Sequence, residues 1–278
     1  MKTLAIDIGG TKLALALFED GKIVQQARRP TDRERGPAYA LPEIAAIAKQ
    51  WSGFEACGVG FGGPVDFDNQ RVALSTHAAG WDGFPLRDHL QAVLGVPVII
   101  DNDANVAALG ESRFGAGVGQ LPMFYITVST GVGGGLVLAD GCVYRGANSW
   151  ACEIGHLTIR PGGPECLCGA RGCLERMCCG LWLERDHGQS PRALFEDAAF
   201  VERYVVDLAL GVKAALMLLN PAVVVIGGGI AQAGDRLFVP LREELARQWP
   251  DWSGARTEVL QAALGEHSVL WGAYALTE

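Results

Sequence analysis

The chain has 278 residues, of which 49 % are hydrophobic and only 19 % are charged. This composition excludes a disordered protein and allows one large or two medium domains with a sizeable core. The net charge of −8 disfavours a nucleic-acid or anionic-membrane surface, and no apolar run approaches membrane-spanning length.

The eight cysteines raise the question of disulfides. No export signal precedes them, because Met1 and Lys2 lead directly into a short apolar run that is broken by Asp7. We therefore expect a cytoplasmic protein whose cysteines are metal ligands and free thiols.

The first thirty residues predict three strands. Residues 3–8 and 13–18 are apolar and β-prone, and the turn between them contains Gly9, Gly10 and Thr11. Asp20-Gly21 is a hairpin signal that leads into a third strand. The backbone N–H groups of the glycine turn, with Lys12 beside them, can cradle a phosphate, although no P-loop sequence occurs.

The next segment predicts a helix over 37–51 and strands over 56–61 and 96–100. Asp101, Asn102 and Asp103 follow the last strand and precede a helix over 104–114. Carboxylates at this point of an α/β fold lie where ligands bind. Simple N-capping is the alternative, but it accounts for one of the three polar residues.

Residues 123–145 repeat the architecture of the N-terminus. A strand over 123–129 precedes a glycine turn over 130–135, a short strand over 136–138, Asp140-Gly141 and a third strand. We interpret this as an internal duplication whose two turns could clamp a polyphosphate. A dinucleotide-binding fingerprint is the alternative, but Leu136 occupies the place of its third glycine, and a strand follows it.

The C-terminal part predicts a long helix over 201–219, a buried strand over 222–226 and a helix over 235–247. Gly227, Gly228 and Gly229 form a third glycine turn at the end of that strand. A short strand near Val259 and a helix over 268–276 complete the chain.

A structural zinc site is predicted between these two halves. One histidine and three cysteines on a Pro/Gly-rich connection form a tetrahedral ligand set, namely His156, Cys166, Cys168 and Cys173. Four protein ligands leave no open position, so the metal is expected to hold the chain and not to do chemistry. Free cysteines near a core histidine are the alternative.

Two glutamates flank this ligand set. Glu153 precedes His156 by three residues, and Glu175 follows Cys173 by two. Zinc would fix both carboxylates relative to the imidazole, which suits the binding of a polyhydroxylated ligand. The alternative is a pair of solvated surface glutamates.

The chain resembles the ROK family (repressors, open reading frames and kinases) of the actin-like sugar-kinase superfamily over essentially its whole length. The resemblance rests on these motifs: Asp7-x-Gly-Gly-Thr-Lys12, Gly60-x-Gly-Gly-Pro-x-Asp66, Asp101-Asn-Asp-Ala-Asn105 with Gly110-Glu111, Ser129-Thr-Gly-x-Gly-Gly-Gly135, Glu153-x-Gly-His156 and Cys166-x-Cys-Gly-x2-Gly-Cys-x-Glu175.

The resemblance implies an α/β, two-domain actin-like (ribonuclease H-like) ATPase fold with a structural zinc loop over 156–173. The small N-terminal domain would span 1–101 and be completed by the helix 266–278, and the large C-terminal domain would span 102–265. It further implies an ATP-dependent kinase for the 6-hydroxyl of a hexose or N-acetylhexosamine, with glucose and N-acetylmannosamine as leading substrates. ATP, Mg²⁺ and structural Zn²⁺ are the expected cofactors, and the chain is expected to form a homodimer.

The site residues implied by the resemblance fall into three groups. Asp103 would be the catalytic base. The sugar would be held by Asn102, Glu153, His156, Glu175 and Gly63. The nucleotide would be bound by Asp7, Gly9, Gly10, Thr11, Lys12, Thr130, Gly131, Gly133, Gly227 and Gly228.

Three segments near the expected sugar pocket depart from the family pattern. They are the loop 75–81 with His77, the Trp150-Ala151-Cys152 stretch and Cys178-Cys179-Gly180. The preferred sugar is therefore not determined by the sequence.

A sugar-responsive transcription regulator of the same family is the alternative function. It is disfavoured because the first predicted strand begins at Thr3 and leaves no room for a DNA-binding module before it. A non-catalytic sugar-binding protein is disfavoured because Asp103 is present.

Overall fold

Two five-stranded mixed sheets form the framework of the computed structural model, which describes residues 1–75, 78–250, 252–254 and 257–278. The N-terminal sheet has the order β3-β2-β1-β4-β7, with bounds β1 (Lys2–Ile8), β2 (Lys12–Glu19), β3 (Lys22–Pro30), β4 (Ala56–Phe61) and β7 (Val98–Asn102). The C-terminal sheet has the order β10-β9-β8-β11-β12, with bounds β8 (Met123–Val128), β9 (Val132–Val137), β10 (Val143–Tyr144), β11 (Val223–Gly227) and β12 (Glu258–Gln261). The short hairpin of β5 (Val65–Asp66) and β6 (Arg71–Val72) stands apart from both.

The two sheets share one topology. In each, the first strand pairs antiparallel with the second and parallel with a later strand, and a further parallel strand closes the edge. The internal duplication predicted from the glycine turns is therefore confirmed at the level of architecture. Because β1, β4 and β7 run in parallel, their carboxyl ends meet at one edge of the N-terminal sheet.

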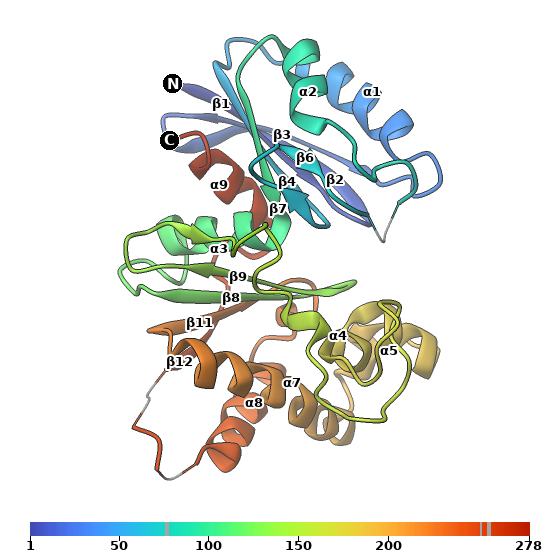
Figure 1. Ribbon diagram of the computed structural model, residues 1–278, viewed down its shortest axis with the longest axis vertical. Helices are drawn as coiled ribbons and strands as arrows, with labels where there is room; N and C mark the ends of the chain where they lie inside the picture. The colour runs from blue at the N-terminus through green and yellow to red at the C-terminus, as the bar shows by residue number, and fades with distance from the viewer. Residues whose placement is uncertain (76–77, 251, 255–256) are drawn as a thin grey trace.

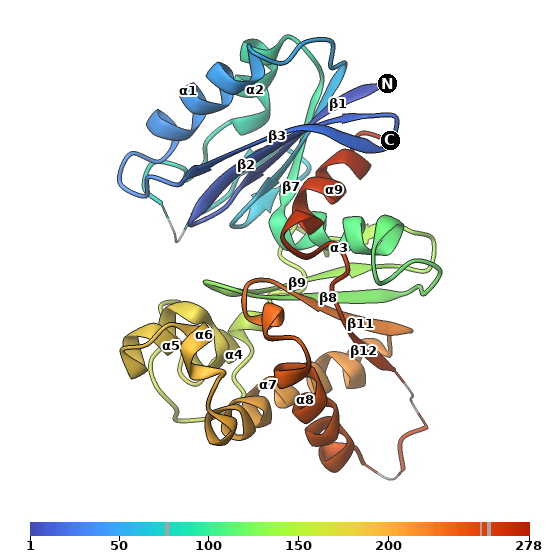
Figure 2. The same cartoon turned by 180° about the vertical axis from the view of Figure 1, so that it is seen from behind.

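Helices cover both faces of each sheet (Figures 1 and 2). On the N-terminal sheet, α1 (Pro37–Ala48) and α2 (Leu86–Leu94) pack on one face and α9 (Ser268–Ala275) on the other. On the C-terminal sheet, α7 (Ala198–Leu219) and α8 (Asp235–Gln248) pack on one face and α3 (Asp103–Phe114) on the other. The remaining short helices are α4 (Leu174–Cys178), α5 (Gly180–His187), α6 (Pro191–Leu194), η1 (Ile154–His156), η2 (Ile230–Ala233) and η3 (Gly265–His267).

The helices α3 and α9 lie between the two sheets and touch each other closely (Figure 1). A Cβ atom on Gly272 would lie 1.7 Å from the carbonyl oxygen of Val106, and one on Gly110 would lie 2.4 Å from that of Ser268. Glycine is therefore required at both positions, because only a missing side chain allows the two backbones this approach.

The carboxylate of Glu111 stabilises the contact between α3 and α9. It is fully buried in α3 and accepts hydrogen bonds from the N–H groups of Ala116, Ala263 and Leu264 at 2.9–3.0 Å. It also accepts one from the hydroxyl of Ser268 at 2.7 Å. Three of these four donors belong to the segment that leads into α9, so one side chain holds the C-terminal helix to α3.

The glycine run of the second half is a strand where the sequence predicted a turn. β9 begins at Val132, so the turn is confined to Ser129–Gly131. A Cβ on Gly135 would lie 2.6 Å from the carbonyl oxygen of Ala104, because α3 packs directly against the backbone of β9. The glycines therefore serve close packing. Several short elements were missed by the sequence analysis, namely α2, α4, α5 and the β5–β6 hairpin.

Among the described residues, no helix has the length and apolar character needed to cross a membrane.

We expect Glu111→Gln to destabilise the protein by roughly 2–4 kcal/mol, since a glutamine amide group turns a donor toward buried N–H groups that need an acceptor. Urea unfolding at pH 7 measures this difference. The exposed Glu184 on α5 provides the matched control, because Glu184→Gln should change the free energy of unfolding by less than about 0.5 kcal/mol. Equal effects of the two substitutions would contradict the role given to Glu111.

Candidate active site

Two carboxylates meet where the N-terminal sheet ends. Asp7 is the penultimate residue of β1, and Asp103 is the first residue of α3, directly after β7. A Cβ on Gly62 would lie 3.4 Å from Oδ2 of Asp103 and 3.3 Å from Cα of Gly9, so the glycine turn and Asp103 are both neighbours of Gly62. The structure thus brings together residues that the sequence places about a hundred positions apart.

The pKa of Asp103 is raised to about 7, first by burial and then by the nearby carboxylate of Asp7, with a smaller contribution from Glu153. The pKa of Asp7 is raised to about 6 by burial, against the opposing effect of the Lys12 ammonium, 3.5 Å away. A carboxyl group with a pKa near neutrality can exchange a proton with a bound hydroxyl group. Asp103 is therefore suited to act as a general base.

The first glycine turn is held rigidly by its neighbours. The N–H of Gly9 donates to the carbonyl of Lys12 at 2.9 Å, which closes the turn. From outside, the Thr31 hydroxyl donates to the carbonyl of Gly9 at 2.7 Å and Nε of Arg33 donates to that of Gly10 at 2.8 Å. These contacts occupy the carbonyl groups on one side of the turn, and neither Thr31 nor Arg33 was singled out by the sequence analysis.

The second glycine turn belongs to the C-terminal sheet. The N–H of Ser129 donates to the carbonyl of Gly131 at 2.8 Å, and the N–H of Gly180 donates to that of Ser129 at 2.7 Å. Glu175 accepts the N–H of Val132 at 2.9 Å. Thr130 and Gly131 lie in this turn, as predicted, whereas Gly133 lies in β9 opposite Thr127.

The third glycine turn adjoins the second. Gly227 ends β11, and Gly228 has a φ of +89°, with no room for a Cβ, which would lie 2.4 Å from the carbonyl oxygen of Val128. A cavity of about 600 Å³ opens beside Gly229. Its other lining residues come from α6, η2, α8 and the segment after α6, and include Arg192, Phe195 and Arg236.

The side chains of Glu153, His156 and Glu175 gather close together. Glu153 and His156 bracket η1, and Glu175 lies in the first turn of α4. The pKa of Glu153 is raised by partial desolvation and by the Glu175 carboxylate, while the His156 ring opposes the shift. These three side chains therefore form one polar cluster, although one carboxylate oxygen of Glu175 accepts a hydrogen bond from the backbone next to the second glycine turn.

The predicted metal ligands converge. One ligand atom from each of His156, Cys166, Cys168 and Cys173 lies within 4.8 Å of all the others. The Sγ atoms of Cys168 and Cys173 are 3.7 Å apart, which is close to the roughly 3.8 Å edge of a tetrahedron with Zn–S bonds of about 2.3 Å. The donor set and its size therefore fit a structural zinc ion.

The backbone explains this convergence. A hairpin brings the chain back on itself, with the N–H of Leu174 donating to the carbonyl of Leu157 at 2.9 Å and that of Cys166 to Ala170 at 2.8 Å. Gly172 has a φ of +67°, and a Cβ there would lie 1.8 Å from the carbonyl oxygen of Arg160. Glycine at this position is what lets the two arms of the hairpin meet.

Both polar atoms of the Asn102 side chain form hydrogen bonds within the protein. Its Oδ1 caps α3 by accepting the N–H groups of Ala104 and Asn105, and its Nδ2 donates to the carbonyl of Gly63 at 3.0 Å. The N-capping alternative considered from the sequence is thus correct for Asn102. His77, from the loop that departs from the family pattern, lies outside the described residues.

The comparisons with known proteins agree on one family. The model of the ROK family matches residues 3–278. A glucokinase of Thermotoga maritima is 35% identical, with 98% of this chain and 96% of the relative covered. An N-acetylmannosamine kinase of Vibrio cholerae serotype O1 is 34% identical, with 84% and 85% covered. The crystal structure of a ROK family glucokinase from Streptomyces griseus in complex with glucose and AMPPNP superimposes with a TM-score of 0.87 at 27% identity, covering 99% of both chains.

The chain therefore belongs to the ROK family. Within that family it is a sugar kinase, an enzyme that transfers a phosphoryl group from ATP to a sugar.

Asp103→Asn should stabilise the protein at alkaline pH. The folded-state pKa of about 7 lies above the ordinary value of 3.8, so the folded protein is penalised for ionising Asp103 once the pH rises above 3.8, and the penalty is complete above about 7. We expect the variant to gain about 2 kcal/mol at pH 8, and the gain to vanish as the pH falls toward 4. Urea unfolding at both pH values tests this, with Asp68→Asn, at an exposed position, as the control. A gain that does not depend on pH would contradict the raised pKa.

Proposed function

We propose that this kinase phosphorylates the 6-hydroxyl of a hexose or N-acetylhexosamine, with glucose and N-acetylmannosamine as the leading substrates. The observation that carries the proposal is Asp103, a carboxylate with a pKa near 7 that faces the first glycine turn and senses the charge of Glu153. The two relatives named above support one sugar each. Residues 75–81 and 150–152 depart from the family pattern, and one change in a pocket can shift selectivity, so glucose and N-acetylmannosamine are both retained as candidate substrates.

The chemistry follows from the position of Asp103. Its carboxylate takes the proton of the sugar hydroxyl as the hydroxyl oxygen forms a bond to the γ-phosphorus of ATP, and the bond from that phosphorus to the bridging oxygen breaks to release ADP. Mg²⁺, carried in with the nucleotide, would neutralise phosphate charge, and Asp7 would hold it through water. The N–H groups of the glycine turns would bind the phosphates.

The nucleotide would extend from one glycine turn to the others. Gly9, Gly10, Thr11 and Lys12 would bind phosphates from the N-terminal sheet, and Thr130, Gly131 and Gly133 from the C-terminal sheet. Gly227 and Gly228 would lie by the nucleoside, because Gly229, the next residue, lines the cavity of about 600 Å³. The size and arginine-bearing wall of this cavity suit a nucleoside with its phosphate tail.

The sugar would be held by the cluster around the metal hairpin. Glu153, His156 and Glu175 can accept or donate to several hydroxyl groups, with Asn102 and Gly63 supporting the side nearest Asp103. Zn²⁺ bound by His156 and the three cysteines would fix these groups without taking part in the reaction, because a full set of protein ligands leaves no open position. One nitrogen of a metal-bound imidazole is left to donate to an oxygen partner, here a sugar hydroxyl.

The domain division at 101–102, with the helix 266–278 returning to the N-terminal domain, is part of the proposal. It is supported by the packing of α9 on the N-terminal sheet. Closure of the two domains on the sugar would exclude water from the transfer. No observation on the described residues favours a transcription regulator over this kinase.

A homodimer is likewise proposed. Large apolar side chains at the end of α7, in β10 and in the segments after β10 and η1 are exposed around a hollow of about 560 Å³, namely Tyr144, Trp150, Leu157, Leu218 and Leu219. A contiguous exposed apolar surface of this kind is typical of a protein–protein interface. Sedimentation velocity at micromolar concentration distinguishes a dimer from a monomer.

The function is tested by ADP release across about a dozen sugars. We expect glucose or N-acetylmannosamine to stimulate release most strongly, and Asp103→Asn to lower that turnover by about 10²–10⁴-fold with a much smaller change in sugar affinity. Absence of stimulation by every sugar would refute the kinase substrate class. Near wild-type turnover in a folded Asp103→Asn variant would assign the proton transfer to another residue.

Loss of zinc should weaken sugar binding selectively. Cys168→Ser, or removal of the metal by chelation, should raise the sugar KM by about 10–100-fold and leave the ATP KM within about two-fold, because local disorder over 161–175 frees Glu153, His156 and Glu175 together. Both constants and the zinc content are measured on the same protein. Cys142 is exposed and outside the ligand cluster, so Cys142→Ser is the control. Equal loss of ATP and sugar binding would indicate collapse of the fold, and no loss would leave the metal without a role.

A further inference from the structure

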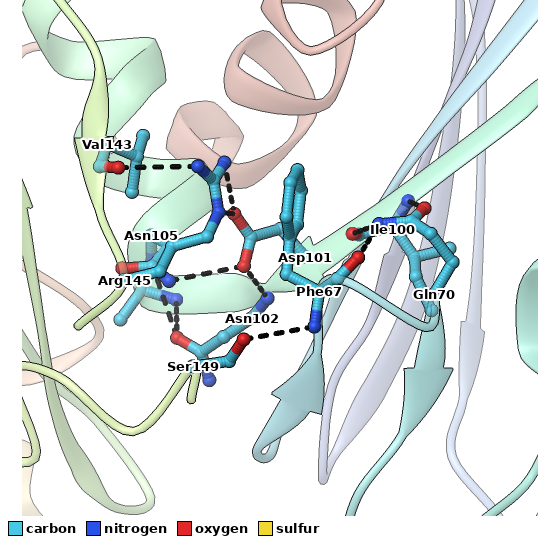
Figure 3. Close-up of polar contacts among 10 residues, drawn as sticks. Phe67, Gln70, Ile100, Asp101, Asn102, Asn105, Val143, Arg145 and Ser149 are labelled. Carbon is cyan, nitrogen blue, oxygen red and sulfur yellow. Dashed lines mark hydrogen bonds and ion pairs between the residues drawn. The ribbon is translucent and has the colours of Figure 1, made fainter. Parts of the chain in front are cut away.

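A buried carboxylate next to the catalytic base ties the two sheets together (Figure 3). Asp101 is 1% exposed, and its Oδ1 accepts the N–H of Asn102 at 2.7 Å and Nδ2 of Asn105 at 3.1 Å. Its Oδ2 accepts Nε of Arg145 at 2.9 Å and lies 2.8 Å from Nη2 of the same guanidinium group. Asp101 belongs to β7 of the N-terminal sheet, whereas Arg145 directly follows β10 of the C-terminal sheet.

The same arginine fixes a third segment. Its guanidinium group lies 3.6 Å from the centre of the Phe67 ring, in the turn between β5 and β6. The N–H of Phe67 donates to the hydroxyl of Ser149 at 3.1 Å, on the loop that follows Arg145. Gln70, in that same turn, accepts the N–H of Ile100 at 2.9 Å and donates to its carbonyl at 3.1 Å, so the turn is also bound to β7.

We propose that Arg145 is a positioning residue for phosphoryl transfer, acting through Asp101 to hold Asp103 in register with the loop that carries Glu153. The inference rests on the proposed function, since it assigns Arg145 a part in that reaction. Arg145 has no role in the site described above, and the sequence gives it no more prominence than any arginine at the end of a strand.

The path from Arg145 to the catalytic base is short. Asp101 fixes the peptide N–H of Asn102 and the side chain of Asn105, which lie on either side of Asp103 in sequence. Asn102 in turn caps the first turn of α3 and donates to Gly63. A rotation of the Asp101 carboxylate would therefore be transmitted to the helix end from which the side chain of Asp103 projects.

The path from Arg145 to the sugar cluster is also continuous. The carbonyl of Arg145 accepts the N–H of Ala151 at 3.2 Å, and Glu153 follows two residues later. Ser149 and Cys152 have φ values of +65° and +66° in this loop, a backbone conformation that residues other than glycine rarely adopt. Such a loop keeps its shape only where surrounding contacts impose it, and the Ser149–Phe67 bond and the Arg145 carbonyl supply such contacts.

Arginine suits this task in a way that lysine does not. Two nitrogens of one planar group converge on Oδ2 of Asp101 while the face of the same plane stacks on Phe67. A lysine ammonium has a single nitrogen and no flat face, so it can replace the charge but not the orientation. Arg145→Lys therefore separates positioning from simple charge neutralisation.

The experiment compares Arg145→Lys with Arg113→Lys. Arg113 lies at the C-terminal end of α3, far along the helix from Asp103, and pairs with Glu278 at 3.5 Å. We expect Arg145→Lys to lower kcat by about 10- to 100-fold, to raise the sugar KM, and to leave the ATP KM within about two-fold. Hydrogen exchange of the peptide that covers residues 102–110 should be faster than in the wild type. Arg113→Lys should change none of these. In Arg145→Ala, added guanidinium ion at millimolar concentration should restore part of kcat.

Each other outcome is decisive. Wild-type kcat in Arg145→Lys, a loss of kcat that only follows the folded fraction in a melting curve, or unchanged hydrogen exchange would overturn the positioning role. If wild-type protein releases no ADP with any sugar, the proposed function fails on its own. Hydrogen exchange needs no turnover, so it still decides whether Arg145 holds the first turn of α3.

Discussion

The carboxylate of Glu111 is the interaction on which the arrangement of the two sheets depends. It lies in α3 and accepts hydrogen bonds from three N–H groups and one hydroxyl, and three of these donors precede or begin α9. A buried carboxylate is stable in such a position only when hydrogen bonds replace the water that it has lost. The C-terminal helix is thereby returned to the N-terminal sheet, and α3, with Asp103 at its other end, is held between the two halves.

At the N-terminal end of α3, by contrast, several buried carboxyl groups lie near one another. Asp7, Asp101 and Asp103 lie close together at the edge of the N-terminal sheet, and burial raises the pKa of each. Arg145 lowers the pKa of Asp101 and Lys12 lowers that of Asp7, whereas the neighbouring carboxylate of Asp7 raises the pKa of Asp103 further. Backbone N–H groups oppose the rise in the pKa of Asp103 but do not cancel it, so ionising this carboxyl group lowers the stability of the fold at neutral pH.

Glycine has three distinct uses in this chain. At Gly110 and Gly272 it allows two helices to touch, at Gly135 it allows α3 to lie against a strand, and at Gly228 it permits a left-handed turn against the end of β8. A glycine run looks the same in the sequence for each use. This ambiguity explains why the segment 130–135 was predicted as a turn when most of it is strand, since only the position of α3 separates the two readings.

Local chemistry let the sequence by itself determine the order of most of the elements, the duplicated β-hairpin units, the cluster of one histidine and three cysteines, and the place of Asp103 after a strand end. Each of these depends on residues that are neighbours in the chain or that repeat at a fixed spacing, so the pattern can be recognised in the sequence without knowledge of the tertiary structure. The tertiary structure alone decided that Asp103 has a pKa near 7, that Glu111 binds the segment before α9, and that Arg145 reaches Asp101. These contacts join residues 44 to 157 positions apart, and nothing in an isolated arginine or glutamate indicates its distant partner. Their energies come from burial and from opposing charges, which exist only once the two sheets have closed around α3.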